Sequence, residues 1–292
     1  MKIRSLPFVA AVVVLAACSG GPTGPNFTTT TETTGSITTT LGPTVTTGPD
    51  ESSGCPGDGL PVEAGELLNA AEASSDAEQI SAIGWVGQEG CEIFTIDFAT
   101  DQGAPATTPP SVDAEFLREV GIVRVALDVE MTSITDQLAE TALVRQVFVA
   151  RRDDRTLFVD LHLSAPALAT VTTNSSPAQV FITLEPGGSD YAGSPTIGAN
   201  VVVVTPVEGP VDTTVAVNGY SRNFEANTIG RISQGSNVLA EAFTTAADWT
   251  ETWGEFSLTL EVPGSGPADL FVGEQSAEDG SDRGVVIPID LP

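Results

Sequence analysis

The sequence predicts an all-β protein with two consecutive β-sandwich domains. Residues 83–188 and 200–292 consist mainly of short segments that are β-branched or that alternate between polar and apolar residues. Gly, Pro, Asn and Asp separate these segments at the short intervals that a sandwich requires. Hydrophobic residues make up 41% of the 292 residues, which is enough for real cores, and this length accommodates about two domains.

The charge balance excludes several classes of function. The chain has 39 acidic against 11 basic residues and a net charge of −28, so it repels phosphate backbones and does not suit nucleic-acid binding. His162 is the single histidine, which leaves no multi-histidine metal site. We therefore predict neither a metal nor another cofactor.

The first eighteen residues have the pattern of an export signal. Lys2 and Arg4 precede an apolar stretch over residues 7–17, which is too short to span a hydrocarbon core of about 30 Å as a helix. The stretch ends in Leu-Ala-Ala-Cys at Cys18 and resembles the lipobox of bacterial lipoproteins. The resemblance implies that residues 1–17 are a signal peptide and that Cys18 becomes the lipidated first residue. It also implies that acyl chains anchor the protein to the extracytoplasmic face of the cell membrane. The alternative is ordinary secretion with an incidental cysteine.

Residues 18–54 are expected to form a disordered linker after the lipidated cysteine. Twelve of the twenty residues from Thr28 to Thr47 are threonine, and apolar residues are too few to form a core. As a flexible coil, such a linker has an r.m.s. reach of roughly 30–35 Å. It would hold the folded part away from the membrane.

Two cysteines remain when Cys18 is lipidated. An extracytoplasmic compartment permits disulfides, so we predict a bridge between Cys55 and Cys91. The bridge would close a loop of about 36 residues and would stabilise the fold by roughly 3–4 kcal/mol in the chain-entropy model. The alternative is two free, buried thiols.

The first domain is predicted over residues 55–188. A short helix is expected around residues 63–73, because Leu67, Leu68 and Ala71 fall on one helical stripe, and a second one over residues 133–140. The remaining pattern predicts strands over residues 91–98, 121–127, 143–150, 156–163 and 178–184.

Two of these predicted strands carry a resemblance. Residues 157–163 (LFVDLHL) and 178–184 (AQVFITL), with the order of the strands, resemble the AMIN-like domains of actinobacterial envelope proteins. The resemblance implies a noncatalytic module that faces the cell wall, in known cases through peptidoglycan. It transfers no ligand-contacting residue.

The second domain is predicted over residues 200–292. Strands are expected over residues 201–206, 215–220, 223–226, 228–233, 238–244, 253–258, 268–274 and 285–289. Eight short strands separated by turn residues are typical of a β-sandwich. The Asp279-Gly280 pair predicts a hairpin turn of the type I′ class, with a calcium loop over residues 278–282 as the alternative.

The second domain also resembles a known family, the immunoglobulin-like domain of bacterial spore germination. The residues that carry the resemblance keep the family's order and spacing: Pro206, Val217, Gly219, Phe224-Glu225-Ala226, Trp253-Gly254, Phe256, Ser276, Asp279-Gly280 and Ile287-Pro288-Ile289. The family also occurs in envelope lipoproteins of bacteria that form no spores. It is noncatalytic, so the resemblance implies a binding role.

No residue pattern supports catalysis. Asp160 and His162 share one face of a predicted strand, as a Ser-His-Asp arrangement would need, but no G-x-S-x-G elbow supplies a serine. We interpret the pair as the polar face of that strand. The acidic residues are scattered over turns and polar faces, which does not indicate a glycosidase pair. We therefore predict that the protein is not an enzyme.

Aromatic side chains are the best candidates for ligand contact. Trp249 lies in a polar run and Tyr220 ends a predicted strand, so both are candidate ligand-facing aromatics that would form a stacking platform if exposed. Packing in the core is the alternative, and we expect it for Trp253.

These observations predict a noncatalytic, lipid-anchored protein of the cell envelope that serves in binding or scaffolding. Peptidoglycan, another wall glycan or an envelope protein is the expected partner. A solute-binding or signalling lipoprotein that captures a small molecule between its domains is the alternative, and it would need a deep pocket with convergent polar groups.

Overall fold

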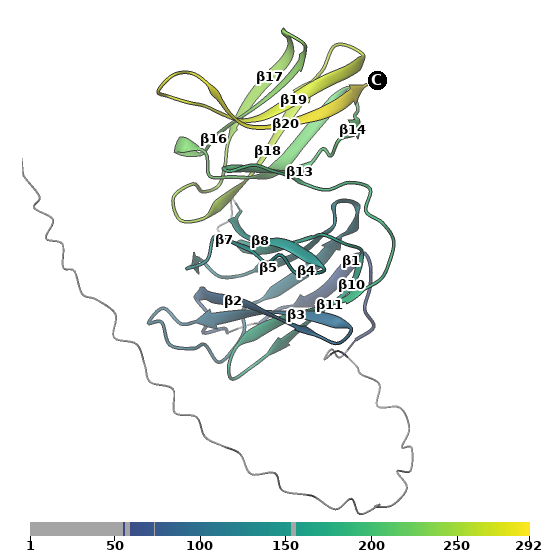
Figure 1. Ribbon diagram of the computed structural model, residues 1–292. Coiled ribbons are helices and arrows are strands. Elements are labelled where there is room, and N and C mark those ends of the chain that lie inside the picture. The colour runs from purple at the N-terminus through teal and green to yellow at the C-terminus, as the bar shows by residue number, and fades with distance from the viewer. Residues whose placement is uncertain (1–54, 56–58, 73, 153–155) are drawn as a thin grey trace, which may run out of the picture. The chain divides into compact units, whose positions relative to one another are not determined.

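The computed structural model of the protein describes residues 55, 59–72, 74–152 and 156–292 (Figure 1). The predicted signal peptide, the lipidation at Cys18 and the threonine-rich linker lie outside these residues. No helix in the described ranges is long and apolar enough to cross a membrane.

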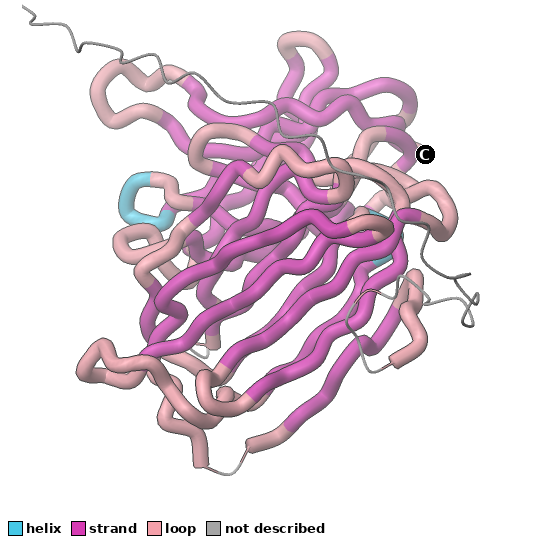
Figure 2. The backbone as a smooth tube through the Cα atoms, turned by 60° about the horizontal axis from the view of Figure 1, so that its bottom comes forward, coloured by secondary structure: helices cyan, strands magenta, loops and turns pink. Residues whose placement is uncertain are grey.

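The all-β prediction is confirmed. Strands account for nearly all regular structure in the described residues, as Figure 2 shows. The helical elements there are two 3-10 turns, η1 (Arg118–Val120) and η2 (Phe224–Ala226).

The first domain is a sandwich of two sheets. One sheet has the order β10-β11-β3-β2-β6, and it faces the β1-β4-β5-β9-β8 portion of a larger sheet, with β7 paired to β8. The strands are β1 (Gly65–Ala70), β2 (Gln79–Gln88), β3 (Cys91–Ala99), β4 (Val112–Leu117), β5 (Ile122–Leu127), β6 (Met131–Thr132), β7 (Asp136–Leu138), β8 (Val144–Arg151), β9 (Leu157–Leu163), β10 (Ala167–Asn174) and β11 (Gln179–Pro186). Alternate residues of both sheets, among them Phe94, Ile96, Val149, Leu161 and Ile182, form one buried core.

All five strands predicted in this domain are confirmed, as β3, β5, β8, β9 and β11. The helix expected around residues 63–73 is wrong, because strand β1 occupies the segment and pairs with β4. The register of that pair shifts between Glu66 and Leu68, and both Leu67 and Leu68 pack against the core. Two adjacent half-buried leucines therefore reflect a β-bulge and not a helical stripe.

The helix expected over residues 133–140 is also wrong. Residues Asp136–Leu138 form β7, which pairs antiparallel with β8. The edge of β8 offers unpaired backbone groups, and three residues of extended chain satisfy them.

The second domain is a smaller sandwich. Its outer sheet has the order β14-β20-β19-β16-β17, and strands β18-β15-β13-β12 form the other layer. The strands are β12 (Thr196–Ile197), β13 (Val201–Thr205), β14 (Gly209–Pro210), β15 (Thr214–Ser221), β16 (Asn227–Gln234), β17 (Asn237–Thr245), β18 (Trp253–Glu261), β19 (Gly266–Gln275) and β20 (Asp282–Leu291). Inward residues such as Val217, Ile232, Leu258, Val272 and Ile287 form its core.

Seven of the eight strands predicted here are confirmed, and the strand expected over residues 223–226 is wrong. This segment forms η2, in which Glu225 and Ala226 have positive φ values of 56° and 59°. The Asp279-Gly280 hairpin joins β19 to β20 as expected, and Gly280 has a φ of 69°. Asp279 is not among the residues with positive φ, so the turn does not have the type I′ geometry.

The two sandwiches share one continuous sheet. Strand β8 of the first domain pairs in parallel with β18 of the second, through Ala150 with Trp253 and Arg151 with Gly254. A third buried cluster lies at this junction: Val120, Ile122, Ala126, Phe148, Ala150, Phe158, Val202, Val204, Tyr220 and Trp253. The limits of the two domains remain predictions, because residues 51–292 make up one compact unit.

Candidate functional site

The predicted disulfide is confirmed, because Cys55 and Cys91 are bonded. Their Cα atoms lie 6.1 Å apart, within the usual range for a bridge. Cys91 opens β3 and is buried. The bond therefore ties the start of the first domain to a central strand of its sheet.

Tyr220 does not face a ligand, so this part of the aromatic prediction is wrong. Its side chain is 0% exposed, and its ring lies edge-on or tilted against Phe148, Phe158 and Trp253. Along β15, Val215 and Val217 point into the core of the second domain, and Tyr220 points to the opposite side. The first domain covers that side, which local sequence does not reveal.

Asp160 and His162 also lie at the domain junction. Every residue of β9 is buried: Val159 and Leu161 face the core of the first domain, and Asp160 and His162 face the second domain. The polar face predicted for this strand is therefore buried at the junction and is not open to solvent. His162 is 3% exposed and Asp160 is 0% exposed, so a substrate has no access to a catalytic arrangement here.

A buried polar network holds this junction together. Arg124 donates from Nε to Asp160 Oδ1 over 2.8 Å and from Nη2 to Oδ2 over 2.7 Å. His162 Nε2 is hydrogen-bonded to the Tyr220 hydroxyl. Burial, assisted by Arg124 and Arg145 against the opposing effect of Asp160, lowers the pKa of His162 to about 4. The imidazole is therefore neutral at pH 7, as a buried hydrogen-bonded group should be.

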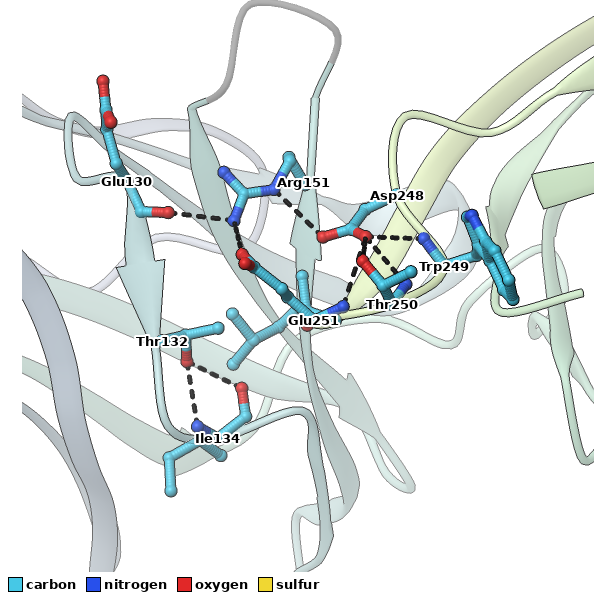
Figure 3. Close-up of polar contacts among 10 residues, drawn as sticks. Glu130, Thr132, Ile134, Arg151, Asp248, Trp249, Thr250 and Glu251 are labelled. Carbon is cyan, nitrogen blue, oxygen red and sulfur yellow. Dashed lines mark hydrogen bonds and ion pairs between the residues drawn. The ribbon is translucent and has the colours of Figure 1, made fainter. Parts of the chain in front are cut away.

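Trp249, the other predicted aromatic, lies on a loop that crosses this junction. The loop, residues 246–252, joins β17 to β18. Asp248 Oδ1 accepts from the backbone N–H groups of Trp249 (2.6 Å), Thr250 (2.8 Å) and Glu251 (3.3 Å), as Figure 3 shows. One carboxylate oxygen thus fixes the backbone of three consecutive residues.

Arg151 of the first domain also binds this loop. Arg151 donates from Nε to Asp248 Oδ2 over 3.1 Å and from Nη2 to Glu251 Oε2 over 3.2 Å (Figure 3). Its Nη2 also donates to the Glu130 carbonyl over 2.9 Å. Burial would raise the pKa of Asp248, but the backbone donors and Arg151 outweigh it and lower that pKa. Asp248 therefore stays ionised and keeps its partners at neutral pH.

Close packing adds two further restraints to the loop. Thr252 donates from Oγ1 to the Val149 carbonyl of β8 over 2.6 Å. Gly254 lies directly under the loop, and a Cβ there would overlap the backbone of Asp248. A glycine is therefore needed for this approach, which gives a physical reason for the Trp-Gly pair at residues 253–254.

Trp249 pairs with a second exposed aromatic residue. Its ring centroid lies 5.5 Å from that of Phe224 at an interplanar angle of 72°. Trp249 is 37% exposed and Phe224 is 58% exposed. We call these two residues the aromatic corner. Trp249 was predicted as a candidate ligand-facing aromatic, and the structure leaves it accessible, pointing away from Arg151 in Figure 3.

The turn that carries Phe224 is anchored to two neighbouring segments. Phe224 N–H donates to Glu274 Oε2 of β19 over 2.7 Å. Ala246 N–H, at the start of the Trp249 loop, donates to the Ala226 carbonyl over 2.9 Å. Phe224 was expected only as part of a strand that carries the family resemblance, and its exposure follows from the positive φ values of Glu225 and Ala226, which the local sequence does not signal. In Figure 1, η2 (green) and the β19–β20 loop (yellow) lie on the left of the second domain.

No metal centre accompanies this site. Within the ranges described above, no group of three or more His, Cys, Asp or Glu side chains is placed to hold a metal ion.

Fold and site define an all-β protein whose C-terminal sandwich presents an exposed aromatic pair on hydrogen-bonded loops, an arrangement that fits a noncatalytic binding module in general. A sequence-family model described as the immunoglobulin-like domain of bacterial spore germination matches residues 200–281. The match confirms the resemblance predicted for the second domain. A search of curated proteins finds no match to the chain. The AMIN-like character of the first domain remains a prediction.

Proposed function

We propose that this protein is a lipid-anchored, noncatalytic binding protein of the bacterial cell envelope. Its partner is peptidoglycan of the cell wall, and the aromatic corner is the contact surface. The observation that carries the proposal is that Trp249 and Phe224 are exposed side by side on loops restrained from both domains. Binding residues are commonly found on loops that a rigid scaffold positions.

Presentation at the wall is the proposed mechanism. The acyl chains on Cys18 would each contribute about 0.8 kcal/mol per buried CH₂, so two chains give stable anchoring. The linker over residues 18–54 would supply a reach of roughly 30–35 Å. Tethering raises the local concentration of the site at the wall, so a weak affinity suffices.

Capture of a small molecule between the domains has less support. Phe148, Tyr220 and Trp253 fill the junction with ring centroids 5.2–6.0 Å apart. Beside it, two open polar hollows of about 530 and 440 Å³ contain the ion pairs of Arg151 and Arg124. Neither has the apolar, enclosing walls of a solute pocket.

The first test is retention on purified insoluble cell wall. We expect the chain from Ser19 onward to be retained at low and moderate salt, and the double variant Phe224→Ala/Trp249→Ala to lose most of that retention. Trp85→Ala is the matched control, because Trp85 is also 37% exposed and also packs on a phenylalanine. Absence of retention for the parent chain would overturn the wall as partner. Full retention of the double variant would overturn the aromatic corner as the contact surface and would point to the first domain instead.

The anchor is tested separately. Cys18→Ser in the full-length chain should shift the protein from the membrane fraction to the soluble extracytoplasmic fraction. An unchanged membrane fraction would overturn lipid anchoring at this residue.

A further inference from the structure

Two apolar rings remain exposed although each packs against the other. Phe224 is 58% exposed and Trp249 is 37% exposed, with their centroids 5.5 Å apart. The turn that projects Phe224 outward needs positive φ at two consecutive non-glycine residues, Glu225 and Ala226. Such conformations are unfavourable and persist where the surrounding structure enforces them, frequently at ligand sites.

The segments that carry the aromatic corner, together with the segment after Glu274, are rich in acidic residues. Three segments are relevant here. Residues 222–227 contain Phe224, residues 246–252 contain Trp249, and residues 276–282 follow Glu274. They include six acidic residues, Glu225, Asp248, Glu251, Glu278, Asp279 and Asp282, and one basic residue, Arg222. Arg151 pairs with Asp248 and Glu251, and Arg231 pairs with Asp282. Glu225, Glu278 and Asp279 are exposed to solvent.

This combination selects for a cation. The face of an aromatic ring carries negative electrostatic potential and attracts an ammonium group within about 6 Å of its centroid. Carboxylates beside the ring strengthen that attraction and repel anionic ligands. A neutral sugar would gain the stacking contact but not the electrostatic one.

We infer that the aromatic corner binds the primary ammonium group of a wall peptide, with the rings of Phe224 and Trp249 contacting the amine and Glu225 supplying charge. The inference rests on the proposed function, because it names the chemical group of the wall that this surface recognises. It assigns the binding to a side-chain amine rather than to the glycan.

Direct binding is measured with a soluble amine. In a chain from Ser19 onward with Trp85→Phe, Trp249 is the exposed tryptophan, because Trp253 is buried. We expect Nα-acetyl-lysine amide to change Trp249 emission saturably and its Nε-acetylated form to bind at least about threefold more weakly, since an exposed cation–π contact alone gives about that factor. Equal affinity for both forms, or a clear preference for N-acetylglucosamine, would overturn the inference.

Variants locate the site. Phe224→Ala should weaken amine binding by about threefold or more because it removes one ring. Glu225→Gln should weaken binding and reduce its dependence on salt. Val286→Ala is the matched control, since Val286 is 57% exposed on β20 outside the three segments. Amine binding that survives the loss of Phe224 would contradict the assignment.

The cell wall itself separates this inference from the proposed function. Wall whose free amines have been acetylated is compared with untreated wall. Retention on untreated wall but not on acetylated wall supports both the ammonium assignment and the wall as partner. Equal retention on both walls overturns the ammonium assignment and leaves wall binding intact. Retention on neither wall, together with saturable amine binding, overturns the wall as partner and leaves the site.

Discussion

At the scale of single residues, Asp160 matters for stability because its carboxylate is buried in an ion pair. Its carboxylate is 0% exposed and accepts two hydrogen bonds from Arg124, whose side chain is 12% exposed. Burial opposes the charge of Arg124, but Asp160 outweighs it and raises the pKa of the guanidinium. The guanidinium of Arg124 therefore keeps its charge beside this carboxylate.

Asp160→Ala should lower the free energy of unfolding by about 3–5 kcal/mol, because it leaves a buried guanidinium without its main partner. Urea denaturation measures the loss. Asp113→Ala is the control, since Asp113 is exposed on β4, and it should have little effect. A loss for Asp160→Ala no larger than for this control would contradict the buried ion pair.

His162 should make stability depend on pH. Burial lowers its folded pKa to about 4 from the ordinary 6.5, while Arg124, Arg145, Asp160 and the Tyr220 hydroxyl face it. Between these values the unfolded chain binds a proton that the folded chain does not, so stability is complete above pH 6.5 and falls as the pH decreases. The slope is up to about 1.4 kcal/mol per pH unit.

The comparison is the free energy of unfolding at pH 7 and pH 5 for the parent chain and for His162→Gln. The variant should lose most of the pH dependence in this window. The lowered pKa values of Asp76, Asp248 and Asp279 act below their ordinary value of 3.8 and so do not interfere. Identical pH dependence in both chains would show that His162 is not held neutral.

At the scale of elements, contacts from the first domain hold loop 246–252 of the second domain in place. Arg151 lies at the end of β8 and reaches two acids of the loop, while Thr252 bonds the backbone of the same strand. The orientation of Trp249 therefore depends on the first domain. A contact over about 100 positions of sequence has no local signal.

Arg151→Gln should loosen this loop and lower wall retention towards that of the double variant Phe224→Ala/Trp249→Ala, with a loss in stability of about 1–3 kcal/mol for the unpaired carboxylates. Hydrogen exchange at residues 249–251 should accelerate. Arg145→Gln on the same strand is the control, because Arg145 is exposed. Unchanged hydrogen exchange in Arg151→Gln would mean that the hydrogen bonds from the loop backbone to Asp248 suffice to hold the loop.

The whole molecule is expected to unfold as one unit. The junction cluster joins Ile122, Phe148 and Phe158 of the first domain to Tyr220 and Trp253 of the second. Separating the sandwiches would expose these rings to water, so each domain stabilises the other. Calorimetry of the chain from Ser19 onward should show a single transition, with equal calorimetric and van't Hoff enthalpies. Two resolved transitions would contradict this coupling.

The disulfide acts on the entire chain through the unfolded state. Cys55 and Cys91 are 36 positions apart, so replacing both by alanine should cost roughly 3–4 kcal/mol in the chain-entropy model. Urea denaturation of the double variant, compared with the oxidised parent, measures this. Reduction of the parent should reproduce the loss, and a variant as stable as the parent would leave the bridge without a stabilising role.

Alternation and turn chemistry were enough to predict the all-β class, twelve strands and the Cys55–Cys91 bridge, because these depend on period-two patterns and on the pairing of two cysteines. Local pattern failed at β1, β7 and η2, where a bulge, a strand edge and two left-handed residues follow from contacts with distant segments. The same limit explains the site. Trp249 stood out in a polar run, whereas the burial of Tyr220 and His162 and the pairing of Trp249 with Phe224 depend on which faces long-range packing covers.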